Sequence, residues 1–331
     1  MKILSLIFGI LLLCVGTTSA QDSTILGSIP VDKEIDAIAL APNTGKAYGI
    51  SSEEKTLYIF DLKNYTIKKK VKLSKKPNAI AVNPSNNLAF ITLKKSDNKG
   101  GLYVIDSEGT ILKTVDIPQD PQGIAVNGIQ IVIALEKDKK LLILSPDTYA
   151  VTNTINLTHR PRFISFDTDS NKAVVVAGKA QGEGKQNIIL IVDLNTGNVL
   201  YEIELEKEIK SVAIDTEKDI AVAVSGTEIT LIDINTGIVL STIKTDNAEG
   251  VDINQSTHAA IIAKEKGFLL IDLNTQTTTE YTLPKKDEAE TVAVDRFKNT
   301  ALIAVEEQII EIQLPNPRPE ITNLVPRSAR S

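Results

Sequence analysis

The chain has 331 residues, of which 42% are hydrophobic and 24% are charged, so it is long and apolar enough to bury a sizeable core. Its formal net charge is −6, from 36 basic and 42 acidic residues, which argues against a nucleic-acid partner or an anionic membrane surface. Tryptophan is absent and aromatic residues make up only 4%, so Ile, Val, Leu and Ala must build the core, and their β-branched members favour sheet.

Residues 1–20 have the features of a secretory signal peptide. Lys2 precedes an apolar run over residues 3–15, and small residues follow as far as Ala20. The run is shorter than the roughly 20 residues that a membrane-spanning helix needs. We therefore expect cleavage after Ala20, a secreted, periplasmic or cell-surface protein, and no membrane insertion of the mature chain. Cys14, the single cysteine, lies inside the run, so the mature chain would have no disulfide and no thiolate metal site.

Beyond residue 20, one pattern recurs seven times with a period of about 42 residues. Each copy begins with a short apolar segment that has an anchor residue, usually small, at its centre. The anchors are Ala39, Ala81, Ala125, Ser165, Ala213, Asp252 and Ala293. Three further apolar segments follow each of the first six anchors. In the fourth segment the apolar residues are an even number of positions apart, as in Ile67, Val71 and Leu73, which is the period of a strand.

Four-stranded units repeated at this period predict an all-β fold, a seven-bladed β-propeller with four antiparallel strands in each blade. Aspartates end five of the third segments, just before a turn, and we interpret them as turn-initiating residues. They are Asp61, Asp106, Asp193, Asp233 and Asp272. The seventh copy has only three segments, and residues 24–31 repeat the spacing of a fourth. We therefore expect the N-terminal strand to complete the last blade and close the ring.

The second copy resembles a known repeat family most clearly. It reads Pro-Asn-Ala-Ile-Ala-Val-Asn-Pro over residues 77–84 and Leu-Tyr-Val-Ile-Asp over residues 102–106. These segments are similar to the YVTN-type β-propeller repeat, and the resemblance implies a propeller domain over residues 21–315. The WD-repeat and quinone-cofactor propellers have a recurring Trp that this chain lacks.

A proline-rich linker follows the propeller domain and occupies residues 316–331. Within it, residues 319–329 resemble the opening strand of an immunoglobulin-like IPT/TIG module. The alternative interpretation of this segment is a solvated tail.

Strand order predicts that the connections from fourth to first strands and from second to third strands emerge on one side of the ring, which we call the mouth face. The longest of these connections are residues 94–101 and 178–187, and variable loops on a rigid scaffold usually carry binding. Three residues before each anchor, at the mouth of the central channel, every copy has a polar residue. This mouth ring consists of Asp36, Asn78, Gln122, Arg162, Lys210, Glu249 and Glu290.

The predicted mouth ring is bipolar. Copies four and five contribute Arg162 and Lys210, whereas copies six, seven and one contribute acidic residues. We expect such a mouth to orient a small zwitterionic or sugar-like ligand, with the two cations holding an anionic group. His159 and Arg160 lie beside Arg162 and join the candidate ligand-binding residues. The alternative interpretation is a solvated channel mouth with no ligand.

Residues suited to catalysis or metal binding are scarce. His159 and His258, the two histidines, fall on opposite sides of the predicted ring, so they cannot share a metal or a haem. Residues 167–171 alternate oxygen-bearing side chains but lack the Gly and the distal Glu of a calcium loop, and we interpret them as a turn. Nucleophile elbows, phosphate-binding loops and paired-His motifs are not found. We therefore assign no catalytic residue, no metal and no cofactor.

These observations favour a monomeric, non-catalytic binding or scaffold module. Its partner would be a protein or glycan at the mouth face, or a small polar ligand at the channel mouth. Two alternatives belong to other classes of protein. One is a hydrolase similar to the lactonase propellers that uses the polar mouth, and the other is an electron-transfer partner of a quinone or haem protein.

Overall fold

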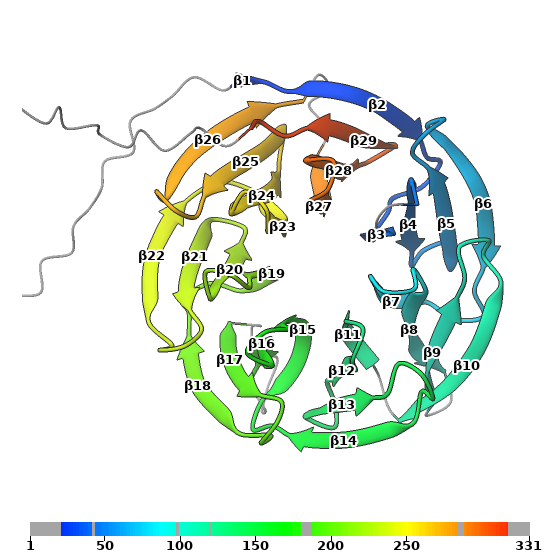
Figure 1. The fold of residues 1–331 in the computed structure, drawn as a ribbon, viewed down its shortest axis with the longest axis vertical. Coiled ribbons are helices and arrows are strands. Elements are labelled where there is room, and N and C mark those ends of the chain that lie inside the picture. Colours follow the sequence, from blue (N-terminus) through cyan, green and yellow to red (C-terminus); the bar gives the residue numbers. More distant parts are fainter. Residues whose placement is uncertain are drawn as a thin grey trace, which may run out of the picture.

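The computed structural model describes residues 21–41, 44–96, 99–118, 121–179, 187–283 and 288–316. These residues form seven sheets arranged in a ring (Figure 1). The described part of the chain contains strands and no helix, and hence no helix that is long and apolar enough to cross a membrane. The predicted fold is confirmed: the protein is a seven-bladed β-propeller of four-stranded antiparallel blades.

Each blade runs outward from an inner strand near the ring axis, in sequence order except where the last blade takes its outer strand from the N-terminus. The inner strands are β3 (Ala37–Ala41), β7 (Pro77–Val82), β11 (Pro121–Val126), β15 (Arg160–Asp167), β19 (Ile209–Asp215), β23 (Ala248–Asn254) and β27 (Ala289–Asp295). The second strands are β4 (Lys46–Ser51), β8 (Ala89–Ser96), β12 (Ile131–Leu135), β16 (Lys172–Gly178), β20 (Ile220–Ser225), β24 (Ala259–Lys264) and β28 (Thr300–Val305). The third strands are β5 (Thr56–Asp61), β9 (Lys99–Ile105), β13 (Lys140–Leu144), β17 (Ile188–Asp193), β21 (Glu228–Asp233), β25 (Gly267–Asp272) and β29 (Gln308–Gln313). The outer strands are β6 (Thr66–Lys72), β10 (Ile111–Pro118), β14 (Val151–Asn156), β18 (Val199–Glu204), β22 (Val239–Lys244), β26 (Thr277–Thr282) and β2 (Thr24–Pro30).

Depth within the blade decides how each strand is buried. Every residue of β20 is buried, because both faces of a second strand pack against neighbouring blades. A strand covered on both faces must be apolar on both faces, which is why such strands read as continuous aliphatic runs. The outer strand β6 has no fully buried residue, and it carries consecutive lysines. The proportion of apolar residues in a strand therefore depends on the position of that strand within its blade.

The hydrophobic core is divided among the seams between adjacent blades. Seven clusters of buried side chains occupy these seams. In the seam between the last and first blades, Ile29 and Ile309 pack in one cluster with Ala47 and Phe60. Each large aliphatic side chain so buried contributes about 1.5–3 kcal/mol to stability. Stability is therefore spread around the whole ring.

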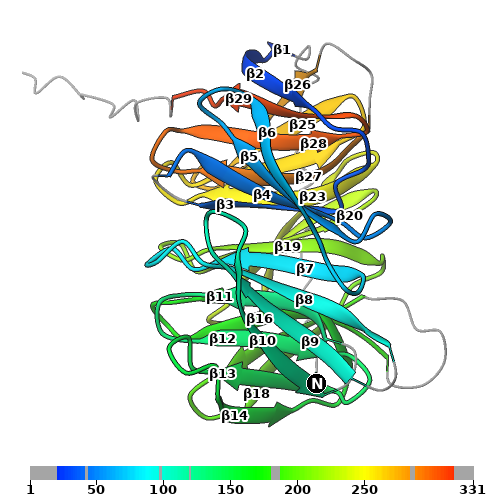
Figure 2. The same ribbon diagram turned by 90° about the vertical axis from the view of Figure 1, so that its right-hand side faces the viewer.

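β2 closes the ring by completing the last blade, as predicted. It pairs antiparallel with β29, with Thr24 opposite Gln313 and Pro30 opposite Gln308. A contact that the sequence did not predict precedes it, because β1 (Gln21–Asp22) pairs in parallel with β26 of the sixth blade. The N-terminal segment therefore holds two blades. Figures 1 and 2 show β1, β2, β26 and β29 gathered at one edge of the ring.

The aspartates at the ends of third strands initiate turns, as predicted. Asp193 Oδ1 accepts hydrogen bonds from the backbone N–H groups of Asn195 at 2.8 Å and Thr196 at 3.3 Å. Gly197 then adopts a φ of +75°, a conformation that costs glycine little. Asp233 makes the same turn with Asn235 at 2.8 Å. These side chains satisfy backbone donors where the strand ladder stops.

Several sequence expectations lie outside the described residues. They are the signal peptide over residues 1–20, the tail from residue 317 onward, and the central parts of the two long mouth-face connections at residues 97–98 and 180–186.

Candidate functional site

The mouth-ring residues lie at the beginnings of the seven inner strands. In five of these strands the pairing register skips the mouth residue, as between Pro161 and Phe163, where Arg162 is the extra residue of a β-bulge. The register of β11 shifts across both Gln122 and Gly123, and Asp36 directly precedes β3. A bulge re-aims a side chain and ends regular pairing. In these five strands the mouth residue therefore has no partner in the regular strand pairing.

Contacts between neighbouring blades join some of these residues. Lys210 forms an ion pair with Glu249 of the next blade. The Asn78 side-chain amide donates to the backbone oxygen of Pro121 at 2.6 Å. Inner strands also approach closely here, since a Cβ on Gly123 would lie 2.5 Å from the backbone oxygen of Arg162. Glycine is therefore required at that position by the adjacent strand.

Negative charge gathers on the side of the mouth formed by the sixth, seventh and first blades. Burial raises the pKa of Glu290, and the nearby carboxylates of Glu34, Glu249 and Glu288 raise it further, while Lys210 acts in the opposite direction. A hollow of about 150 Å³ opens beside this cluster, and its lining residues are Asn247, Glu249, Glu265, Glu288 and Ala289. Lys210 pairs with Glu249 and Lys266 with Glu265, but within the described residues no ion pair engages Glu34, Glu288 or Glu290.

Positive charge without a carboxylate partner is found on the fourth blade. Arg162 is exposed, and its guanidinium lies 5.2 Å from the ring centroid of the adjacent Phe163. Within the described residues, neither Arg162 nor Arg160 forms an ion pair. The fourth blade lies across the ring axis from β3 and β27 (Figure 1). We expected Arg162 and Lys210 to hold an anion together, but the Lys210 ammonium is already engaged by Glu249.

The two histidines each contact a carboxylate. His159, in the connection before β15, has its Nε2 2.9 Å from Glu202 Oε1. His258, in the turn between β23 and β24, has its Nδ1 2.9 Å from Oδ2 of the fully buried Asp215. The two connections emerge on opposite faces of the ring, as predicted. The two histidines therefore contact different carboxylates on different faces of the ring.

The Asp167 segment is a turn, as interpreted from the sequence. The buried Asp167 carboxylate accepts hydrogen bonds from the backbone N–H groups of Asp169 at 2.8 Å and Ser170 at 3.2 Å, and from the Ser170 hydroxyl. The carboxylate oxygens of Asp167 are thus used to stabilise the turn to which Asp167 belongs. Across the described ranges, no group of three or more His, Cys, Asp or Glu side chains is arranged to hold a metal ion.

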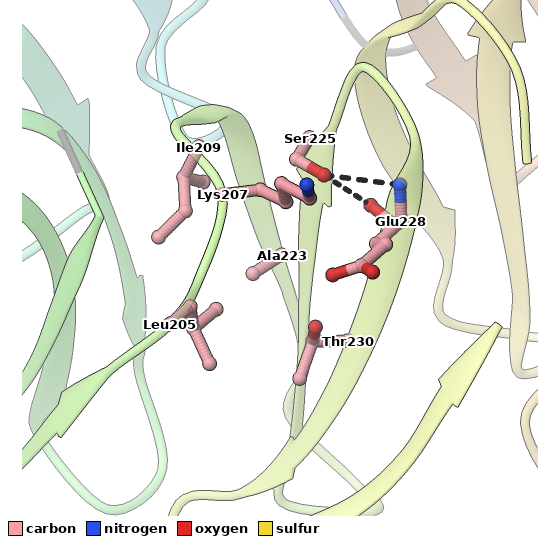
Figure 3. Close-up of a pocket in the computed structure, with 7 residues that line it drawn as sticks. All are labelled: Leu205, Lys207, Ile209, Ala223, Ser225, Glu228 and Thr230. Atoms are coloured by element: carbon pink, nitrogen blue, oxygen red, sulfur yellow. Dashed lines mark hydrogen bonds between the residues drawn. The ribbon is translucent and has the colours of Figure 1, made fainter. Parts of the chain in front are cut away.

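A second hollow lies between the segment that leads into β19 and the strands β20 and β21 (Figure 3). Its volume is about 10 Å³, enough for one water molecule. The Ser225 hydroxyl donates to the backbone oxygen of Glu228 and accepts from its N–H, both at 3.0 Å. This hollow is too small for an organic ligand.

Sequence reasoning overlooked part of the acidic cluster. Glu34 and Glu288 each stand two positions before a mouth-ring residue, and Arg160 stands two positions before Arg162. The repeat therefore has a second recurring polar position, two residues before the mouth-ring residue, that could have revealed this part of the cluster. Glu265, from the connection between β24 and β25, has no counterpart in that pattern.

Asp252 was identified only as an anchor. Its Oδ2 accepts a hydrogen bond from the Val294 N–H of the neighbouring inner strand at 2.8 Å, and its Oδ1 accepts from the Ile253 N–H at 2.8 Å. Burial raises the pKa of this carboxyl to about 6.

Neither a scan of the chain against protein-family models nor a search of the curated proteins finds a match.

Proposed function

We propose that this propeller is an exported, non-catalytic binding module of the YVTN type, whose mouth face binds a partner that carries separated charges. A small amine-bearing ligand, such as an amino acid or an amino sugar, suits the acidic side of the mouth. A protein or glycan with complementary charges would use the same face. The YVTN assignment rests on the repeat segments at residues 77–84 and 102–106.

One observation carries this proposal: like charges are crowded at the mouth. Glu34, Glu249 and Glu288 raise the pKa of Glu290, so these carboxylates repel one another in the folded protein. Such an arrangement opposes folding, and perturbed titratable groups of this kind concentrate at functional sites. An ammonium group in the hollow of about 150 Å³ would relieve the repulsion. Binding would therefore be driven by charge neutralisation.

The test is a thermal-shift screen of the chain from residue 21 onward against amino acids, amino sugars, neutral sugars and lactones. We expect amine-bearing compounds alone to raise the unfolding temperature. The double variant Glu288→Gln/Glu290→Gln should abolish the increase given by amino sugars, which carry no carboxylate, because it removes two charges and little volume. Asp147→Asn/Glu217→Gln, which removes two exposed charges from turns on the opposite face, is the matched control and should behave as the unmodified protein.

Stabilisation by an amino sugar, which carries no carboxylate, that survives in the Glu288→Gln/Glu290→Gln variant would contradict the proposal. So would turnover of a lactone that depends on the mouth-ring residues, since that result would assign the face to a hydrolase.

A further inference from the structure

The connection between β14 and β15, together with the first residues of β15, contains three cationic or potentially cationic side chains, those of His159, Arg160 and Arg162. A hydrogen bond from the Leu157 N–H to the backbone oxygen of Lys139, at 2.7 Å, fixes the beginning of this connection. Arg160 opens β15 opposite Gly178, and Arg162 follows in the bulge. His159 precedes them. The backbone of these residues is therefore held by strand pairing and a neighbouring turn.

Two buried nitrogens in this segment have no hydrogen-bond partner in the described structure. One is Nε of Arg160, and the other is Nδ1 of His159. An arginine side chain stays charged at all physiological pH values and can only donate hydrogen bonds. Buried donors in folded proteins almost always have an acceptor, so the acceptor for Arg160 Nε is to be sought outside the described residues.

Two carboxylates of β18, the outer strand of the same blade, are already engaged. Glu202 contacts His159 Nε2 at 2.9 Å, and Glu204 forms an ion pair with Lys179 at 2.6 Å. Elsewhere the protein balances its less exposed cations, as where Lys264 contacts both Asp246 and Glu280. Arg160, which is half-buried and forms no ion pair among the described residues, differs from this pattern.

We propose that Arg160 and Arg162 form a binding site for an oxyanion, a carboxylate, phosphate or sulfate group of a ligand. A guanidinium offers parallel N–H donors in a planar fork, which matches two oxygens of such a group. The exposed Arg162 would contact the group from the solvent side, and His159, whose Nε2 contacts Glu202, directly precedes Arg160 in the chain. This inference rests on the proposed function and deepens it, since it adds an anion site on the blade opposite the acidic cluster.

The experiment titrates the chain from residue 21 onward with phosphate, sulfate and acetate at constant ionic strength, with chloride as the reference ion. We expect calorimetry to detect binding of at least one oxyanion and none of chloride. Tighter binding of acetate would indicate a carboxylate ligand, and tighter binding of phosphate or sulfate a tetrahedral one. At a concentration 100 times the dissociation constant, the unfolding midpoint should rise by roughly 4 °C.

Three variants test the assignment. Arg160→Lys keeps the charge and loses the fork, and Arg162→Gln removes the exposed cation with little risk to folding, so each should weaken binding about tenfold or more. Arg296→Gln is the matched control, because Arg296 lies over its neighbour Phe297 at 4.9 Å as Arg162 lies over Phe163. Oxyanion binding no tighter than chloride binding, or unchanged in both β15 variants, would overturn the inference.

The two proposals can fail separately. The Glu288→Gln/Glu290→Gln variant should bind the oxyanion as the unmodified protein does. If the unmodified protein binds an oxyanion but no amine, only the proposed function is overturned. If it binds an amine but no oxyanion, only the oxyanion site is overturned.

Discussion

Asp252 is the only charged anchor among seven, and its environment explains how a carboxyl is accommodated there. The other anchors are small because inner strands of adjacent blades approach closely at this depth. Asp252 uses that proximity, since one of its oxygens accepts from Val294 on the next inner strand and the other from Ile253. Burial nevertheless disfavours the charged form, and the pKa of the carboxyl is about 6.

The pKa of Asp252 predicts a loss of stability between about pH 4 and pH 6. A carboxyl whose pKa is higher in the folded protein than in the unfolded chain binds its proton more tightly when folded, so acid favours folding. The rise from 3.8 to about 6 corresponds to about 3 kcal/mol, which is present below pH 4 and lost above pH 6. Urea unfolding at a series of pH values should show a loss of stability over this range that is smaller by about this amount in Asp252→Asn than in the unmodified protein.

Asp106 provides the control of opposite sign. Hydrogen bonds from the backbone N–H groups of Thr110 and Glu108 lower its pKa. Its contribution is therefore present at neutral pH and lost as the pH falls through its lowered pKa. An Asp252→Asn protein that loses as much stability between pH 4 and pH 6 as the unmodified protein does would contradict the account of Asp252.

At the scale of elements, β2 is the component on which ring closure depends. Its residue Ile29 is 1% exposed, and Val31, just beyond the strand, is 6% exposed. The Tyr65 ring lies against Gly27, where a Cβ would be 2.3 Å from the ring, and its hydroxyl donates to Glu311 at 2.9 Å. β2 thus completes the last blade and contacts the first.

Deleting residues 24–31 should destabilise the whole ring. The loss of two buried aliphatic side chains and of the pairing with β29 should cost roughly 5 kcal/mol or more, because one blade loses a strand and one seam loses part of its core. Deletion of residues 21–23 alone removes only the short β1 pairing and serves as the control. Calorimetric melting separates the two outcomes, and an equal midpoint for the 24–31 deletion and the full chain would refute the role of β2.

At the scale of the whole molecule, closure brings the two ends of the propeller domain together. Thr24 is paired with Gln313, and Leu314 is held by a hydrogen bond from its N–H to the backbone oxygen of Asn299 at 2.9 Å. The ring is therefore closed by hydrogen bonds and packing between segments from opposite ends of the sequence. Continuity of the chain at the connection between β2 and β3 is not what holds the last blade.

A circular permutant tests this property. The permuted chain would begin at Glu34, run to Leu314, and continue through a four-residue turn into residues 24–33. We expect it to fold and to melt within a few degrees of the original, because every pair of strands in the last blade is preserved. The same chain ending at Leu314, without residues 24–33, should be strongly destabilised. A permutant that fails to fold would show that the original connection is essential.

The sequence by itself determined the architecture of this protein. The repeated anchors, the even spacing of apolar residues and the incomplete seventh copy predicted the number of blades, the strand order and the closing strand. Burial of a strand is imposed by its depth in the blade, and that depth recurs with the repeat, so a local pattern carries the global fold. The mouth ring was found in the same way, because its residues keep a constant distance from the anchors.

The tertiary structure alone decided which charges meet. Distances between blades and bulges in the inner strands determine the Lys210 ion pair with Glu249 and the approach of Glu34 and Glu288 to Glu290. They also leave Arg160 Nε without a hydrogen-bond partner among the described residues. The hydrogen bond from Val294 to Asp252 likewise joins residues of two different repeats. A repeat pattern indicates which face a residue occupies within its own blade. It does not indicate which side chain of the neighbouring blade lies opposite that residue.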